Sequence, residues 1–185
     1  ALWEDGYSVK FPNSKHIDCE GSLVSGYVDT DSKEFAVAAL HPDAEEIFIH
    51  EYCHYTQWKE DCKVWRDNYI YGRDSCTILD EWLSHELEMP DYQVQDVCRR
   101  VANVELDCEI RVVEFIKKHN LKNDIKTYTQ KANGYVTLYY VIPKTRKWCN
   151  KKSPAQVKAI VDAMPSTFDV DHSKLAEEFE DLYVE

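Results

Sequence analysis

The sequence predicts a single, mostly helical α+β domain over residues 1–185, with a small β-sheet ahead of the helix that carries the chemistry. Three observations support this prediction. The chain is long enough to close one hydrophobic core, and it contains no internal repeat or linker. Apolar residues recur at helical spacing through most of the chain after residue 44. A strand-like pattern is confined to residues 21–40, so the sheet should be small.

The strands are expected first. Residues 1–20 show little periodicity. Residues 22–28 and 35–40 are the predicted strands, and a polar turn at residues 29–33 joins them into a hairpin. His41-Pro42 then interrupts the chain, which places the end of the hairpin just before the first helix.

Helices are predicted from there to the end of the chain. The first begins at Ala44, with Asp43 as its cap, and extends to about Trp65. The longest begins at Asp91, directly after Pro90. Later helices are delimited by proline and polar residues. The predicted ranges after the first helix are 80–89, 91–119, 125–141, 153–163 and 171–182. The apolar stripe of the longest helix consists of Val94, Val97, Cys98, Val101, Cys108, Val112 and Phe115.

The composition excludes several classes of protein. A net charge of −12 opposes binding to nucleic acid, and no apolar run is long enough for a membrane span. One basic cluster surrounds Trp148, and we interpret it as a solvated loop, with a phosphate or partner contact as the alternative. Seven cysteines without a C-x-x-C pair predict free thiols and a cytoplasmic protein. The basic cluster consists of Lys144, Arg146, Lys147, Lys151 and Lys152.

The main chemical motif is His50-Glu51-Tyr52-Cys53-His54, an H-E-x-x-H sequence in the first predicted helix. Residues four apart lie on one face of a helix, so both imidazoles can reach the same ion. Zinc takes tetrahedral nitrogen and oxygen ligands, and a catalytic site keeps one position open for water. His50 and His54 are therefore candidate ligands to one Zn²⁺, and Glu51 is the candidate general base. The alternative is a pair of histidines at the edge of the core.

A catalytic zinc needs a third protein ligand. An H-x-x-G-x-x-H extension would supply one locally, but Gln57 and Glu60 occupy its Gly and last His positions. Glu105 lies on the apolar stripe of the longest helix and is the candidate ligand, because a buried carboxylate is costly unless it is paired or binds metal. Glu109, one turn later, is the candidate acceptor that orients a ligand histidine. Asp107 is rotated by about 200° from Glu105 and should face solvent.

Other interpretations stay open. The two acids on the stripe could form buried ion pairs with Arg100 or Arg111 instead. His85 begins half of a second H-E-x-x-H motif that lacks its last histidine, and it is the next candidate ligand. Tyr135 and Tyr139 are candidates for donating a hydroxyl to the tetrahedral oxyanion, although a tyrosine-rich helix face is more often core.

With His50, Glu51, His54, Glu105 and Glu109, the chain resembles the gluzincin branch of the zincin metallopeptidases. In that branch the third ligand is a glutamate on a later helix, and an acid four residues after it, usually Asp, contacts a ligand histidine. The strand–turn–helix sequence over residues 35–54 also resembles the small ImmA/IrrE-type peptidases of bacteria and phages. The resemblance implies a zincin-like domain that cuts a protein substrate with one Zn²⁺.

We therefore predict a zinc-dependent peptidase that acts on a protein or peptide substrate, with Glu51 as general base. One alternative is a zinc-dependent hydrolase of a non-peptide amide, which a narrow closed pocket would favour over an open strand edge. A second is a non-enzymatic zincin-scaffold module that binds a protein partner, although such a module has no use for Glu51. A DNA-associated protease is supported only by the basic cluster.

Overall fold

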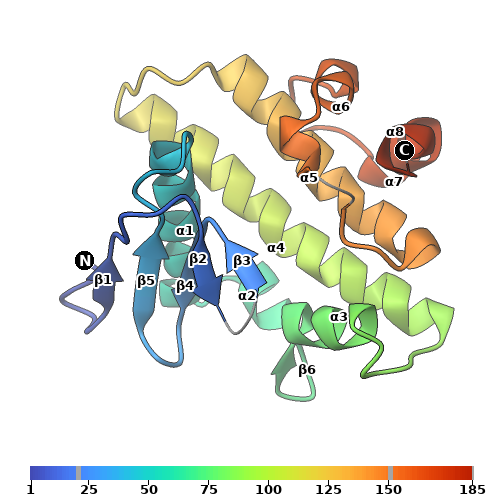
Figure 1. Cartoon of the computed structure of the whole chain (residues 1–185), viewed down its shortest axis with the longest axis horizontal. Helices are drawn as coiled ribbons and strands as arrows, with labels where there is room; N and C mark the ends of the chain where they lie inside the picture. Colours follow the sequence, from blue (N-terminus) through green and yellow to red (C-terminus); the bar gives the residue numbers. More distant parts are fainter. Residues whose placement is uncertain (20–21, 150–151, 185) are drawn as a thin grey trace. The chain divides into compact units, whose positions relative to one another are not determined.

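The computed structural model describes residues 1–19, 22–149 and 152–184, and it is a mostly helical α+β protein, as predicted (Figure 1). It divides into two compact units, Ala1–Cys62 and Lys63–Glu185, here called the N-terminal and C-terminal units. The expectation of a single domain over residues 1–185 stays a prediction. Within the described ranges, no helix is both long and apolar enough to cross a membrane.

The N-terminal unit contains a three-stranded sheet in the order β1-β5-β4. β5 (Glu34–Val37) lies in the middle, parallel to β1 (Ser8–Lys10) and antiparallel to β4 (Gly26–Asp29). Antiparallel pairing of β4 with β5 confirms the predicted hairpin, with Tyr27 opposite Ala36. β4 is an edge strand of this sheet, because β5 is the only described strand that pairs with it.

The first residues of the predicted strand 22–28 form β3 (Ser22–Val24), which belongs to a different sheet from β4. β3 pairs antiparallel with β2 (Ile17–Cys19), and the chain passes through Ser25 before β4 begins. The prediction of one continuous strand over residues 22–28 is therefore wrong. β1 and β2 were not predicted either. Their partners are chosen by long-range pairing that a local alternating pattern does not reveal.

Helix α1 (Ala44–Lys59) packs on β4 and β5 and carries the H-E-x-x-H motif. The core of this unit consists of Leu2, Tyr7, Phe35, Val37 and Tyr55. Asp43 occupies the position before the helix, but its side chain makes no capping hydrogen bond, so that predicted cap is wrong. The helix also ends earlier than predicted, because Asp61 adopts a left-handed conformation with φ of 46°. Trp65 instead belongs to the short helix α2 (Lys63–Asp67) of the C-terminal unit.

The C-terminal unit is built on two long helices that lie side by side (Figure 1). α4 (Asp91–Lys118) agrees closely with the predicted range, and α5 (Ile125–Thr145) begins at the predicted residue, where the Asp124 side chain caps it. α3 (Ser75–Leu83) packs on α4. Four shorter helices pack along α5: η1 (Pro154–Gln156), α6 (Lys158–Ala163), α7 (His172–Glu178) and α8 (Glu180–Val184). The hairpin of β6 (Tyr69–Ile70) and β7 (Arg73–Asp74) precedes α3.

Several predicted boundaries in this unit are wrong for identifiable reasons. α3 begins five residues before the predicted helix, because Asp74 accepts the Thr77 N–H as its cap, and it ends just before His85, which has φ of 65°. α5 continues through Pro143 to a left-handed Arg146. The predicted ranges 153–163 and 171–182 are each divided in two, the second at Phe179.

All seven cysteines are free in the structure, as their number and spacing predicted. Cys53, Cys98 and Cys108 are buried, where a thiol packs as a small apolar group. Burial raises the pKa of the Cys98 thiol to about 12, so it stays protonated and unreactive at neutral pH.

Candidate metal centre

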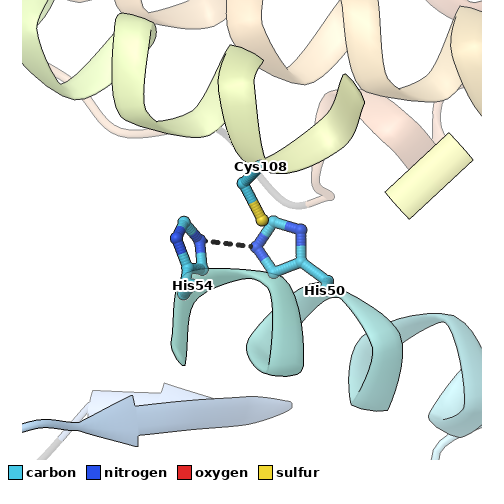
Figure 2. Close-up of side chains that lie close together, drawn as sticks. All are labelled: His50, His54 and Cys108. Carbon is cyan, nitrogen blue, oxygen red and sulfur yellow. Dashed lines mark hydrogen bonds between the residues drawn. The ribbon is translucent and has the colours of Figure 1, made fainter. Parts of the chain in front are cut away.

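The two histidines of the motif converge on α1. Their Nε2 atoms lie 3.1 Å apart, and the rings are nearly perpendicular, at 85°. Figure 2 shows these imidazoles joined by a dashed line, one turn apart on the helix; it also labels Cys108, which belongs to α4. Two nitrogens bound to one tetrahedral zinc at about 2.0–2.1 Å would be about 3.3–3.4 Å apart. The observed separation is therefore close to what a shared zinc ion requires.

Gln57 orients one of these rings. His54 Nδ1 lies 2.8 Å from the Gln57 Oε1 atom, and an amide oxygen can only accept, so Nδ1 carries the proton. In the neutral ring the lone pair then lies on Nε2, the atom that faces His50. Gln57 is fully buried, so the acceptor is held in place. This is the arrangement in which a hydrogen-bonded imidazole ligates a metal through its other nitrogen.

This role of Gln57 was not predicted from the sequence, in which Gln57 stands at the Gly position of an incomplete H-x-x-G-x-x-H extension. The spacing of His54 and Gln57 could have predicted this contact, because residues three apart on a helix are neighbours. An amide oxygen is also a standard acceptor for a histidine N–H.

Glu51 lies between the two histidines in sequence, on the part of α1 that faces β4. A Cβ atom added to Gly26 would lie 3.1 Å from Glu51 Cγ and 2.6 Å from Ile47 Cγ2. Only glycine allows β4 to approach α1 this closely, and the approach places the Glu51 side chain beside an edge strand. The general base predicted from the sequence is thus positioned next to a strand edge that can pair with an extended peptide.

The predicted acids of α4 have the expected helical phase. Glu105 and Glu109 are buried, with exposed fractions of 8% and 6%, whereas the Asp107 side chain is 34% exposed. Asp107 accepts a hydrogen bond of 2.7 Å from Arg111 Nε. The prediction that Glu105 and Glu109 share the apolar side of the helix is confirmed, and their roles toward a metal stay predictions.

The two arginines named as alternative partners of these acids each pair with an aspartate. Arg111 pairs with Asp107, and Arg100 donates to Asp96 at 2.8 Å and to the Asp67 carbonyl. Glu109 accepts a hydrogen bond from the buried Tyr128 hydroxyl on α5. One Glu109 oxygen is therefore tied to the C-terminal unit's own core.

The two candidate oxyanion tyrosines lie together in the C-terminal unit, where Tyr139 belongs to the hydrophobic core and Tyr135 packs against it. Tyr135 and Tyr139 are one turn apart on α5, and their hydroxyls are 3.0 Å apart. Burial raises the pKa of both hydroxyls well above the usual value, and the nearby Glu105 carboxylate raises them further. Both are therefore neutral donors at physiological pH.

The remaining histidine candidates have local or surface roles. His41 Nδ1 accepts the Asp43 backbone N–H at 3.1 Å. His85 is exposed, and its Nδ1 lies 4.0 Å from Glu88. Buried His172 lies 3.0 Å from Asn133 Oδ1 through Nε2.

The basic cluster is largely accounted for by intramolecular pairs. Arg146 donates to both Glu88 carboxylate oxygens at 3.0 Å and to the Trp82 carbonyl, and Lys144 pairs with Glu180. Lys147 and Lys152 are exposed, and Lys151 lies outside the described residues. These contacts favour a structural role for the cluster over a phosphate site.

Comparison of the chain with models of known protein families, with curated proteins and with solved structures found no match. The resemblance to gluzincins therefore depends on the motif residues alone.

Proposed function

We propose that this protein is a zinc-dependent peptidase whose metal is held by His50 and His54. The observation that carries the proposal is the convergence of the two Nε2 atoms at 3.1 Å, with His54 Nδ1 engaged by Gln57. Two lone pairs directed at one point repel unless a cation lies between them or one nitrogen is protonated. Zinc suits this donor set, because neutral imidazole is one of its preferred ligands.

A third ligand is required, and we propose Glu105 for it. The support is chemical: a carboxylate on the buried side of α4 must be paired or bind a metal to offset the cost of desolvation. Glu109 would orient a ligand imidazole by accepting its second N–H. Tyr135 and Tyr139, both neutral, would donate to the oxyanion that develops when the peptide carbonyl is attacked.

The chemistry then divides among the chain's own residues. Zinc, when bound, supplies the Lewis acidity that lets water act as a nucleophile near neutral pH. Glu51 accepts the proton that this water loses and returns it to the leaving amine. The edge of β4 beside Glu51 offers backbone groups to an extended chain, which favours a peptide substrate over a small amide. No membrane partner or nucleic acid is needed for this function.

Metal analysis tests the proposal. The purified protein is expected to contain about one zinc per molecule, because an open catalytic site still has three protein ligands. His50→Ala is expected to lose it, while His119→Ala, which removes an exposed histidine at the end of α4, should retain it. Elemental analysis of protein never exposed to chelator gives the answer. Zinc-free wild-type protein, or equal zinc in wild type and His50→Ala, would contradict the proposal.

Gln57 supports a second, independent test. Gln57→Leu keeps the bulk of the buried side chain but removes the acceptor for His54 Nδ1–H, so zinc affinity should fall by about 10- to 100-fold. Gln57→Glu restores an acceptor and should recover most of the affinity. Competition with a chromophoric chelator measures all three proteins. Unchanged affinity in Gln57→Leu would mean that this hydrogen bond does not orient a ligand.

A further inference from the structure

A buried histidine of the C-terminal unit has no part in the proposed chemistry. His172 is the first residue of α7 and is only 4% exposed, and its Nε2 atom lies 3.0 Å from Asn133 Oδ1 on α5. The fully buried Asn133 also donates through Nδ2 to the carbonyls of Pro165, at 2.8 Å, and Thr167, at 2.9 Å. Because these carbonyls can only accept, Oδ1 is the atom that faces His172, and Nε2 of the imidazole carries the proton.

Asn133 therefore holds both the connection between α6 and α7 and the start of α7 against α5. The His172 ring stacks on Tyr140 of α5, with centroids 6.4 Å apart and planes 12° from parallel. One turn further along α7, Ala176 is buried in the same core as α5. The attachment of α7 to α5 thus begins at an imidazole that is almost completely enclosed.

α8 is attached to α5 by groups that keep their charge near neutral pH. The Tyr183 hydroxyl donates to the Gly134 carbonyl at 2.9 Å, and burial holds the pKa of this tyrosine above its usual range. Lys144 forms an ion pair with Glu180. Among these contacts to α5, the one made by His172 contains the group that ordinarily changes its charge between pH 5 and 7.

Burial opposes a positive charge on His172. It lowers the pKa of the imidazole from its ordinary value of 6.5, and the neighbouring Asp171 carboxylate offsets only part of this effect. Protonation keeps the Nε2 hydrogen bond but adds a charge that little solvent can reach. Other charged or titratable groups lie on α7 and on the helices around it: Lys174, Glu177, Tyr140, Lys144, Glu180 and, across a cavity that α7 also lines, Arg99 of α4.

The lowered pKa makes the attachment of α7 sensitive to acid. A released segment has the ordinary pKa, so it takes up the proton before the attached segment does as the pH falls. The contribution of His172 to the attachment is therefore complete above about pH 6.5 and decreases below it.

We infer that His172 is an acid-sensitive latch: between about pH 7 and pH 5 its protonation releases α7 and α8 from α5, while α4 and α5 stay packed together. The α4–α5 pair has its own hydrogen bond between Tyr128 and Glu109, and Val101 and Val136 belong to its core. Release uncovers the apolar surface of α5 beneath α7 and α8. The latch is independent of the proposed zinc site, because none of its residues is a proposed ligand.

Hydrogen exchange of the full chain, read by mass spectrometry, tests the latch. After correction for the intrinsic exchange rate, amide protection over residues 172–184 is expected to fall by about 10-fold from pH 7.5 to pH 5, and protection of α4 and α5 by less than about 3-fold. His172→Gln keeps a neutral amide donor for Asn133 Oδ1. It should therefore keep the protection measured at pH 7.5 and lose most of the decrease at pH 5.

The matched control is His119→Gln, which removes an exposed histidine at the end of α4 in the same unit. It should show the same decrease in protection as the wild type. Binding of the dye anilinonaphthalene sulfonate provides a second readout, because it reports exposed apolar surface. Its fluorescence should rise at pH 5 in the wild type and in His119→Gln, and much less in His172→Gln.

Three outcomes contradict the latch. A uniform loss of protection over α4, α5 and α7 in the wild type would show that acid weakens the whole unit, whether or not the variants fold. An equal decrease in the wild type and in His172→Gln would show that another group is responsible. Protection over residues 172–184 that is the same at both pH values would show that α7 is not released.

Discussion

Glu51→Gln is expected to retain about one zinc per molecule and to lose turnover by about 100- to 10 000-fold. The substitution keeps the size of the side chain and leaves His50 and His54 untouched, but an amide cannot accept and return the proton of the attacking water. Cleavage of a peptide library, read by mass spectrometry, measures the loss. Metal content of the same preparations shows that the site itself is intact.

The matched control is Glu45→Gln, which removes an exposed carboxylate from the first turn of the same helix. It should cleave the library at the wild-type rate. A Glu51→Gln protein that does so as well would show that Glu51 is not the base. Loss of zinc from Glu51→Gln would instead indicate that this side chain contributes to metal binding.

Glu105→Ala is expected to release most of the zinc, because we propose Glu105 as the third protein ligand of the site. Asp107→Ala should change zinc affinity little, since Asp107 pairs with Arg111 on the exposed side of α4. Glu109→Ala should weaken affinity by about 10- to 100-fold if it orients a ligand histidine. Competition with a chromophoric chelator measures the zinc affinity of the three variants and ranks them.

Two further variants sharpen this series. Cys108 lies on the same buried side of α4 as Glu105, and a thiolate is also a good zinc ligand, so Cys108→Ala tests a direct competitor. Tyr128→Phe removes the hydroxyl that donates to Glu109. If Glu109→Ala and Tyr128→Phe lower the melting temperature equally and neither changes zinc affinity, Glu109 has a role in packing only.

The series also has clear contradicting outcomes. Metal loss in Asp107→Ala with retention in Glu105→Ala would contradict the assignment. Loss in Cys108→Ala alone would transfer the third ligand to the thiol. If no variant on α4 loses zinc, His85 is the next candidate.

Much of the helical structure was determined by local sequence. α4 was predicted almost to the residue because its apolar stripe repeats over many turns between Pro90 and the end of the helix. The same periodicity correctly separated buried Glu105 and Glu109 from Asp107, since the rotation per residue of a helix is constant. The H-E-x-x-H spacing likewise predicted that His50 and His54 would face one another.

Only the tertiary structure decided the features that depend on distant residues. The pairing of β1 with β5 joins segments that are far apart in the chain, and the alternating pattern of residues 22–28 could not show that its halves belong to different sheets. The close approach of Gly26 to Glu51 and the proximity of Trp148 to Tyr139 have the same origin. The spacing of apolar residues in the local sequence determines whether a segment forms a helix or a strand. Which other segment it packs or pairs with depends on packing over the whole fold.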